Sequence, residues 1–289
     1  MKLRNDIRDK LFAELEKNTT DWRRNHLGAS AIGEACLRKV WLNYRWVIAP
    51  NFEGRVLSLF RRGGKEEEIY EEDFGRVEEY RYVTTDSDGE QFKFSAVHGH
   101  FGGSTDGFLF VEDSGEGIWY LVEIKTYNKN RFATLENTGV EMSDPKYFVQ
   151  MQCYLGFTKL LVALFCGTCK DNDKRHFEEV DFIPDEFEEA KEKAEYIVYT
   201  KDLPPKISQN PSAFACKWCA YHALCHKKTT KGTEINCRTC FYGEPSEISK
   251  HGEGSEGKWV CAKGVRKTFM DTEQQKKPCI HHRTILNIL

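Results

Sequence analysis

The order of hydrophobic patterns between residues 92 and 200 constrains the fold of this chain more than any other feature. Three strand-like runs come first, separated by Gly and Asp clusters that supply turns: 92–97, 106–111 and 118–125. A helical pattern follows at 145–156, and the continuously apolar run 160–165 is typical of a strand covered on both faces. A strand at 176–183 and a charged helix at 185–200 complete the series. This order predicts an α/β fold with a mixed central sheet flanked by helices.

Two helical patterns precede these strands. Apolar residues recur at helical spacing over 30–46 and predict one buried helix face. A second helix is predicted over about 57–80, in which Gly63 and Gly64 precede a run of glutamates. This run supplies candidate acidic ligands close to the predicted sheet.

The composition is that of a soluble globular protein, with 40% hydrophobic and 30% charged residues among 289. No apolar run approaches the roughly 20 residues that span a bilayer, and the N-terminus has no apolar signal-peptide core. We therefore expect a cytoplasmic protein without a membrane partner. A net charge of −3 argues against a protein that coats nucleic acid non-specifically, although a local basic groove is compatible with it.

The composition changes after the proline pair that ends the helix at 185–200. Beyond it the chain is rich in Cys, Lys, Gly and Thr and has few aliphatic residues to build a core. We place boundaries near residues 203 and 231. They predict a main domain at 1–230 and a small cysteine-rich, metal-binding module at 231–289.

Asp106, Glu123 and Lys125 form the candidate reactive site. Side chains alternate between the two faces of a strand, so Glu123 and Lys125 lie on one face and Ile124 on the other. Asp106 begins the preceding strand of a predicted hairpin, which can bring its carboxylate near Glu123. Two such carboxylates suit Mg²⁺ or Mn²⁺, and the lysine can stabilise charge that develops on a phosphodiester.

The alternative interpretation is that Glu123 and Lys125 are the solvated face of an edge strand, because an isolated Glu-x-Lys is common by chance. The context favours a site. Asp106 lies in a Gly-rich turn, and a helical pattern carrying Gln150 and Tyr154 follows. Gln150 and Tyr154 are one helical turn apart and therefore share a face.

These residues resemble the motifs of the PD-(D/E)XK nuclease superfamily: Gly103-Ser-Thr-Asp106, Glu123-Ile-Lys125 and Gln150-Met-Gln-Cys-Tyr154. Within it, the chain is similar to phage YqaJ/lambda-type and RecB-like exonucleases and to CRISPR-associated iron-sulphur nucleases. The similarity is clearest at 99–107 and 144–150 and extends from about Leu59 to the C-terminus. It implies a restriction-endonuclease-like fold and a metal-dependent nuclease.

The resemblance also implies roles for the acids and the lysine. Asp106 and Glu123, with the carbonyl of Ile124, hold one or two Mg²⁺ or Mn²⁺ ions. Lys125 orients or deprotonates the attacking water and offsets charge in the transition state.

Three further residues receive roles in the same way. In these families an acid or histidine on the first core helix, four residues after a glycine, completes the metal site. Counting from Gly63 gives Glu67, whereas counting from the next glycine gives Glu68. Gln150 and Tyr154 position the substrate backbone or the lysine.

Cys216, Cys219 and Cys225 form a group that lacks a local fourth ligand. Clustered cysteines in a reducing compartment are more often metal ligands than disulfides, and Cys36 is the candidate fourth residue. Thiolates bind both iron-sulphur clusters and Zn²⁺, so the spacing alone leaves the metal open. The pattern resembles the iron-sulphur staple of the related nucleases, which implies a 4Fe-4S cluster, with zinc as the alternative.

The tail contains a second group, a C-x2-C pair with two widely separated single cysteines: Cys237, Cys240, Cys261 and Cys279. Four thiolates satisfy tetrahedral Zn²⁺, and His281 or His282 could replace the last of them. The group resembles a small zinc module appended in phage relatives. Because the tail has few apolar residues, we expect the metal to be needed for its folding.

The remaining cysteines and two histidines are interpreted as structural. Cys166 and Cys169 also have C-x2-C spacing, but they end the apolar run and are expected at a strand end. Cys153 has the surroundings of a small core residue. His98 and His100 lie in a Gly-rich turn, where histidine is more often structural than catalytic.

The leading hypothesis is a metal-dependent DNA nuclease, specifically an exonuclease acting at DNA ends or on single strands in phage-type recombination or repair, in a bacterial or phage-infected cell. DNA and a recombination or single-strand-binding protein are the expected partners. The alternative is a non-catalytic DNA-binding or scaffold protein with structural metals. A redox or electron-transfer role for the cluster is a third hypothesis.

Overall fold

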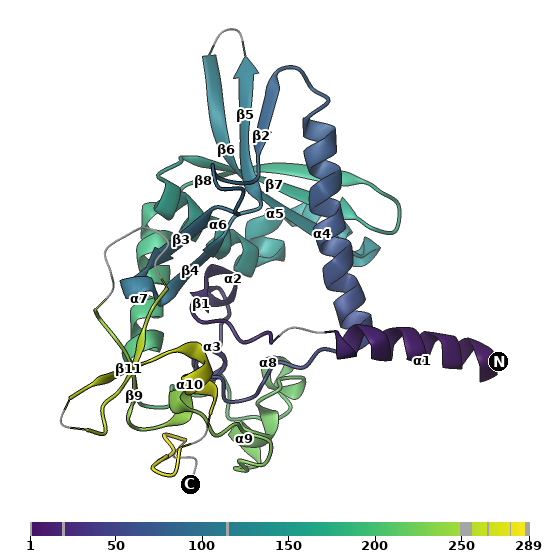
Figure 1. The fold of residues 1–289 in the computed structure, drawn as a ribbon. Coiled ribbons are helices and arrows are strands. Elements are labelled where there is room, and N and C mark those ends of the chain that lie inside the picture. Colours follow the sequence, from purple (N-terminus) through teal and green to yellow (C-terminus); the bar gives the residue numbers. More distant parts are fainter. Residues whose placement is uncertain are drawn as a thin grey trace.

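A five-stranded sheet forms the centre of the molecule, for which the computed structural model describes residues 2–18, 21–113, 116–248, 256–264, 266–277 and 279–286 (Figure 1). The strands, in spatial order, are β2 (Tyr80–Val83), β5 (Gly107–Asp113), β6 (Glu116–Tyr127), β7 (Val162–Cys169) and β8 (Arg175–Asp181). β6 and β7 are parallel, whereas the other neighbours are antiparallel. The mixed, helix-flanked α/β arrangement that the hydrophobic pattern predicts is therefore confirmed.

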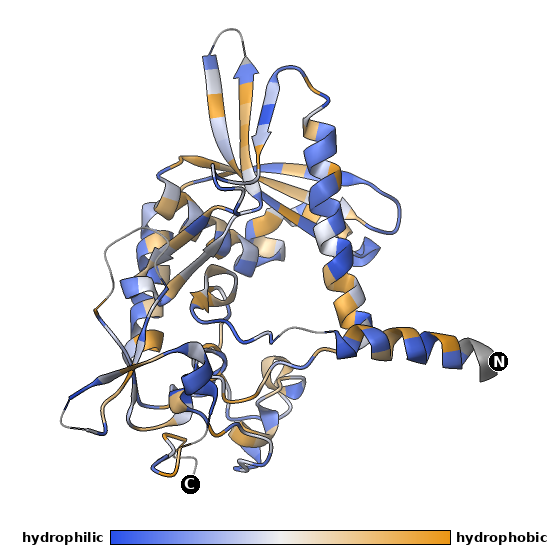
Figure 2. Ribbon diagram, in the orientation of Figure 1, coloured by the Kyte–Doolittle hydropathy of each residue, from blue (hydrophilic) through white to orange (hydrophobic). Residues whose placement is uncertain are grey.

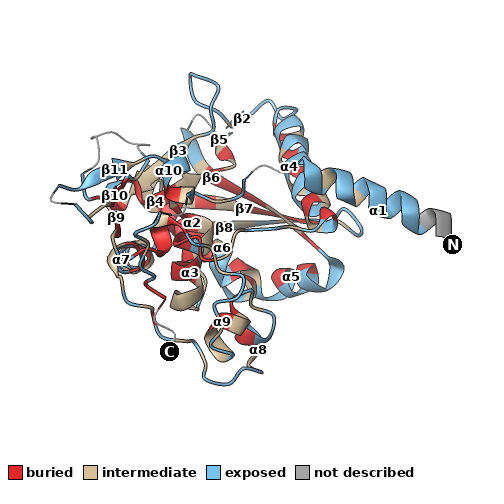
Figure 3. Cartoon of the chain, turned by 60° about the horizontal axis from the view of Figure 1, so that its bottom comes forward, coloured by how far each residue is buried: buried red, intermediate tan, exposed pale blue. Residues whose placement is uncertain are grey.

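α4 (Gly54–Phe74) covers one face of this sheet. The rings of Tyr70 and Phe74, both on α4, belong to a small buried cluster. This cluster also contains Val122 and Ile124, which are alternate residues of β6. Figure 2 shows hydrophilic residues prevailing on α4 beside the sheet and hydrophobic residues at the end that meets α1. α1 (Lys2–Lys17) projects from that end and is largely exposed (Figure 3).

α5 (Lys129–Ser143) and α6 (Pro145–Thr158) cover the opposite face and connect the parallel strands β6 and β7. α6 begins with Pro145, at a helix position where no backbone N–H is required. Because successive side chains of β6 alternate, Glu123 and Lys125 face α6 rather than α4. The two functional candidates of the strand are thus presented to the helix that carries Gln150.

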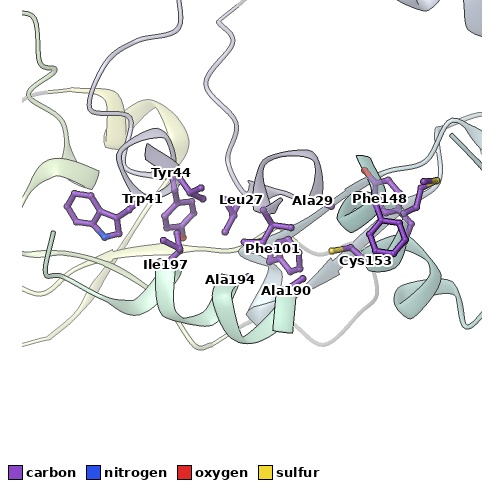
Figure 4. Packing of buried hydrophobic residues seen from close by; sticks show 14 of the residues in the cluster. Leu27, Ala29, Trp41, Tyr44, Phe101, Phe148, Cys153, Ala190, Ala194 and Ile197 are labelled. Carbon is purple, nitrogen blue, oxygen red and sulfur yellow. The ribbon is translucent and has the colours of Figure 1, made fainter. Parts of the chain in front are cut away.

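A second, three-stranded sheet lies beside the first, in the order β1-β4-β3. Its strands and the short elements around it are β1 (Leu27–Gly28), α2 (Ala29–Ile32), α3 (Leu37–Tyr44), β3 (Lys93–Ala96), η1 (Val97–Gly99), β4 (Phe101–Ser104) and α7 (Pro184–Tyr199). Figure 4 shows the core that these elements share, in which Phe101, Trp41 and Ile197 are fully buried.

The C-terminal part consists of short elements around a third sheet, β9-β10-β11. They are α8 (Phe214–Lys217), α9 (His222–His226), η2 (Cys237–Thr239), β9 (Gly243–Pro245), β10 (Trp259–Cys261), β11 (Thr268–Met270) and α10 (Thr272–Lys276). Trp259 belongs to the same buried core as α3. The buried Arg238 donates hydrogen bonds to the carbonyls of Asn25 and Tyr44. The C-terminal part is therefore packed tightly onto the N-terminal segment, and the predicted division at residue 231 stays a prediction.

Several predicted elements have different bounds. The helix predicted over 30–46 is interrupted between α2 and α3, where a Cβ on Gly33 would stand 2.7 Å from the backbone of Lys146. The helix predicted over 57–80 ends at Phe74, because the residues from Tyr80 pair with β5 instead.

The strand predicted over 92–97 also differs, since β3 pairs with β4 and joins the second sheet, not the central one. β4 and α5 are absent from the sequence prediction. Within the described part of the chain, every helix is too short or too polar to cross a lipid bilayer.

Candidate active site

Glu123 is the most deeply buried acid of the candidate site, with 0% of its surface exposed. Its Oε1 accepts a hydrogen bond of 2.8 Å from Nε2 of Gln150 and pairs with the ammonium of Lys125. Its Oε2 is buried and has no hydrogen-bond partner among the described residues. A buried carboxylate oxygen without a partner is costly. This oxygen is therefore disposed to accept a cation or a proton.

Asp106 stands directly before β5 and beside β6. The pairing of Gly107 with Val122 places its carboxylate at the same end of the hairpin as Glu123. Oδ2 of Asp106 accepts a 2.8 Å hydrogen bond from the backbone N–H of Ile124. The side chain is 16% exposed, so it is held by the strand while one edge remains accessible.

The ammonium of Lys125 lies among the oxygens of these acids. It donates a 2.9 Å hydrogen bond to the carbonyl of Ile124, lies 3.7 Å from Oδ2 of Asp106 and pairs with Glu123. Burial lowers the pKa of Lys125, but the two carboxylates outweigh that effect and raise it overall. The ammonium therefore stands between the oxygens to which the family resemblance assigns a metal ion.

The pKa values of two carboxyls of the site, Glu123 and Glu67, are shifted upward. Burial raises the pKa of Glu123, Lys125 opposes the rise, and Asp106 adds to it. Burial and then the charge of Asp106 raise the pKa of Glu67 to about 7. Such shifts are typical of acids gathered for a shared cation or proton.

Glu67, on α4, lies close enough to Asp106 and Lys125 for their charges to act on its carboxyl, with Asp106 raising its pKa and Lys125 lowering it. The neighbouring Glu68 instead pairs with Lys65 on the exposed side of the helix, and its side chain is 59% exposed. Of the two registers that the sequence allows, the arrangement favours Glu67.

Gln150 and Tyr154 share one face of α6, as their spacing predicts, and both are buried. Gln150 contacts Glu123 rather than the lysine or an open surface. Tyr154 lies close to Gln150, and its hydroxyl would be 2.6 Å from a Cβ on Gly103. The pair is thus positioned to hold the Glu123 carboxylate.

Two tyrosines of the site are not apparent from the sequence motifs. The ring of Tyr147 lies 5.3 Å from Nζ of Lys125. The hydroxyl of Tyr82 donates a 2.9 Å hydrogen bond to the carbonyl of Asp106. Tyr147 could have been found three residues before Gln150, on the same helix face. Tyr82 lies on β2, a strand that the sequence pattern does not predict.

The structure brings the first predicted cysteine group together. Cys36, Cys216, Cys219 and Cys225 line one small cavity of about 20 Å³ at the start of α3. Burial raises the pKa of Cys225, and the positive charge of Arg38 opposes the rise. Burial also raises the pKa of Cys219, so both thiols hold their protons more tightly than free cysteine does, and Arg38 offsets only part of this effect at Cys225.

The second group also converges. Cys237, Cys240, Cys261 and Cys279 line one cavity of about 30 Å³, together with His281 and His282. Burial and then the neighbouring thiols raise the pKa of Cys237 to about 11. The ring of His282 also contacts a residue outside this cavity, since its Nε2 lies 3.2 Å from Oγ1 of Thr239.

Across the described ranges, no group of three or more His, Cys, Asp or Glu side chains stands in an arrangement that could hold a metal ion as it is. Convergence of the thiols on common cavities leaves zinc and iron-sulphur binding as proposals. Cys169 ends β7 as expected, whereas Cys166 lies inside the strand, between Ile124 of β6 and Phe177 of β8. Both are buried, as Cys153 is on α6.

The two upstream histidines contact structural partners. Nδ1 of His98 lies 2.7 Å from the hydroxyl of Tyr199. His100 is fully buried, with Nδ1 3.0 Å from the hydroxyl of Tyr44 and Nε2 donating to the carbonyl of Ser246. Burial lowers the pKa of His100 to about 4, so its ring is neutral at pH 7.

No protein-family model matches this chain, and no curated protein sequence matches it. Among solved structures it is similar to an alkaline exonuclease, LHK-Exo from Laribacter hongkongensis, with 17% identity and a TM-score of 0.42 over 65% of this chain and 89% of that one. LHK-Exo in complex with dAMP gives 15% identity, a TM-score of 0.42 and the same coverage. SSO0001 gives 16% identity and a TM-score of 0.40 over 79% and 98% of the two chains. Likenesses this distant do not transfer residue roles to this chain.

Proposed function

We propose that this chain is a nuclease that hydrolyses phosphodiester bonds in DNA with Mg²⁺ or Mn²⁺, acting as an exonuclease at DNA ends or on single strands in phage-type recombination or repair. The observation that carries the proposal is the fully buried Glu123 carboxylate, whose Oε2 has no partner among the described residues. A structural ion pair in a protein interior normally satisfies both oxygens. Leaving one oxygen free beside further acids suits cation binding instead.

The donors of the site fit a hard divalent ion. Asp106, Glu123 and the carbonyl of Ile124 would hold it, with Glu67 as a further ligand, and all four supply oxygen. When bound, such an ion polarises the scissile phosphate and lowers the pKa of a coordinated water. Lys125 offsets the negative charge that develops on the phosphate and orients the attacking water.

Gln150 and Tyr154 act on the acids in this proposal. The amide of Gln150 fixes Oε1 of Glu123, which leaves Oε2 directed to the ligand. Tyr154 fixes Gln150 from the core side. They are positioning residues, and the motif resemblance at Gln150 and Tyr154 is consistent with that role.

The test is digestion of labelled single- and double-stranded DNA by the full chain with Mg²⁺ or Mn²⁺ and with EDTA. Glu123→Gln and Lys125→Ala are expected to fold normally and to lower the cleavage rate by about 10³-fold or more. Glu67→Gln should also impair cleavage. Glu68→Gln is the matched control, because that neighbouring glutamate pairs with Lys65 in solvent.

Undiminished cleavage by Glu123→Gln and Lys125→Ala would contradict the proposal. Binding of DNA without cleavage under any metal condition would favour the non-catalytic DNA-binding or scaffold role. An exonuclease should digest linear DNA and leave covalently closed circles intact, and comparing 5′- with 3′-labelled strands reads its polarity. A recombination or single-strand-binding protein is the proposed partner.

The proposal extends to the two cysteine groups: Cys36, Cys216, Cys219 and Cys225 for a 4Fe-4S cluster, or for Zn²⁺, and Cys237, Cys240, Cys261 and Cys279 for Zn²⁺. Elemental analysis of anaerobically purified protein should give about 4 Fe and 1 Zn per chain. Cys219→Ser should remove the iron and Cys261→Ser the zinc, while Cys153→Ala, at a buried core position, should retain both. Protein containing only zinc would contradict the cluster.

A further inference from the structure

A cleft of about 750 Å³ lies between the segment that follows α1 and the end of α3. Its walls come from distant parts of the chain: 22–31, 43–52, Phe60 of α4, Lys146 of α6 and 220–221. In Figure 1 the segment between α1 and β1 runs from the end of α4 that meets α1 toward β1. Residues 22–31, which include this segment, line one side of the cleft.

Three aromatic rings meet at the rim of the cleft. The centroids of Trp22 and Phe60 are 5.6 Å apart, and Phe52 lies 5.5 Å from Trp22 and 5.0 Å from Phe60. Trp22 is 39% exposed and Phe60 is 44% exposed. Large rings held against one another but left open to solvent offer surfaces on which a flat ligand can stack.

The charged residues that line the cleft are all basic, and one of them, Arg23, pairs with Asp21 and Glu234. Arg23, Arg24 and Lys146 are among the residues that line it, and none of the described lining residues is Asp or Glu. In the whole chain acidic residues outnumber basic ones by 45 to 42. Arg24 and Lys146 are exposed, so their charges are available to a ligand. The cleft is thus locally basic within an acidic protein, as expected of a site for a polyanion.

Two helices that line the cleft also carry residues of the proposed active site. On α4, Phe60 and Glu67 are seven residues apart and therefore lie on nearly the same face, roughly 10 Å apart along the axis. On α6, Lys146 directly precedes Tyr147, whose ring contacts Lys125. Both walls lead from the cleft to residues of the acid cluster.

Two glycines lie on α4 between the ring of Phe60 and the carboxylate of Glu67. A Cβ on Gly63 or on Gly64 would meet nothing within 4 Å, so packing does not require glycine at either position. Glycine inside a helix is destabilising relative to alanine, and it is used where a ligand comes close to the backbone. The surface of α4 at Gly63 and Gly64, which has no side chains, therefore leaves room for a ligand between the cleft and the acids.

We propose that this cleft binds a single strand of DNA, with bases stacked on Trp22 and Phe60 and phosphates paired with Arg24 and Lys146, and that it guides the strand past Gly64 to the acid cluster. The inference rests on the proposed function and specifies its substrate. Exposed rings favour a single strand because the base faces of a duplex are already stacked. The occupant is therefore an unpaired strand rather than a double helix.

The test is fluorescence anisotropy of a labelled oligothymidylate with the full chain in EDTA, so that binding is measured without cleavage. Trp22→Ala and Phe60→Ala should each weaken binding about tenfold, since one stacked base is lost in each. The matched controls are Trp119→Ala, at another tryptophan that is 39% exposed, and Phe241→Ala, at a phenylalanine that is 43% exposed. Both should stay within twofold of the unmodified protein. Trp22→Phe should restore most of the affinity.

The basic residues have a separate readout. Arg24→Ala and Lys146→Ala should weaken binding and reduce the slope of log affinity against log salt by roughly 0.7 for each lost phosphate contact. Lys174→Ala, at an exposed lysine between β7 and β8, is the control.

Each outcome separates this inference from the proposed function. Cleft variants that bind the strand as well as the controls do would overturn the inference, even if the protein cleaves DNA. Cleft variants that change the sedimentation of the protein but not its DNA affinity would make the cleft a protein interface and overturn it as well. A protein that binds the strand through the cleft yet cleaves no DNA would uphold the inference and contradict the nuclease.

Discussion

Two fully buried charges, Glu123 in the central sheet and Arg238 in the C-terminal part, are accommodated in opposite ways. Arg238 donates hydrogen bonds to the carbonyls of Tyr44 and Asn25, and its guanidinium lies 3.5 Å from the ring centroid of Trp46. Glu123 has one oxygen engaged and the other without a partner among the described residues. Both side chains are 0% exposed, so burial alone does not distinguish a structural charge from a functional one.

The difference lies in what surrounds each charge. Carbonyl oxygens and aromatic faces replace water around Arg238, so its charge is compensated without an acid. Burial lowers its pKa only to about 9, and it remains a cation at pH 7. Glu123 is surrounded by other acids and one lysine, and burial raises its pKa. For these two charges, the complete set of partners around Arg238 suits a group that holds the fold, and the incomplete set around Glu123, among other acids, suits a group that binds a ligand.

The largest expected effects come from removing each of the two charges in turn. Arg238→Met leaves the carbonyls of Tyr44 and Asn25 buried without donors, so urea unfolding should show a loss of roughly 3 to 5 kcal/mol in the free energy of unfolding. Cleavage per folded molecule should be unchanged. Glu123→Gln should behave oppositely, with stability within about 1 kcal/mol of the unmodified protein and cleavage lost. Similar stability losses in the two variants would break the comparison.

The surroundings of Glu123 were easier to predict from the sequence than those of Arg238. Strand alternation places Glu123 and Lys125 together from local sequence alone. Helical spacing does the same for Gln150 and Tyr154. Arg238, by contrast, sits between two cysteines in a polar tail, and only its tertiary contacts distinguish it from an exposed arginine.

Local patterns fail for the same reason elsewhere in the chain. The break after Ile32 depends on the close approach of α6 to Gly33, which no helical periodicity reveals. α5 carries only three buried apolar side chains, so its pattern is weak: Phe132, Leu135 and Val140. The cleft beside Trp22 is lined by five separate parts of the chain, so no single part of the sequence predicts it.

A smaller effect, with a definite sign, is expected from His100, which lies in the same buried region as Arg238. Its pKa is lowered from 6.5 to about 4 by burial. The unfolded chain therefore binds the proton more readily, and stability present above pH 6.5 should fall by up to about 3 kcal/mol as the pH drops toward 4. Urea midpoints measured between pH 4 and 7 should show this slope, and His100→Gln should flatten it.

The acid cluster should respond to pH with the opposite sign. Because the pKa of Glu67 is raised to about 7, the metal-free protein should lose stability as the pH rises from 4.5 through 7. Glu67→Gln should remove that loss, and Glu68→Gln should not. A Glu67→Gln variant with an unchanged slope would show that this carboxyl does not share the field of Asp106.

The smallest expected effect, at Gly64, separates stability from ligand binding most sharply. A Cβ there meets nothing within 4 Å, so Gly64→Ala should raise the free energy of unfolding by about 0.5 to 1 kcal/mol through helix propensity. If a DNA strand passes over this turn of α4, the added methyl group should weaken oligothymidylate binding severalfold at the same time. Asn137→Ala, on the exposed side of α5, is the control, because it also raises helix propensity but lies away from the cleft. A Gly64→Ala protein that gains stability and keeps full affinity would show that the strand does not approach this turn. Gly64 would then, like Arg238, have no role in binding the ligand.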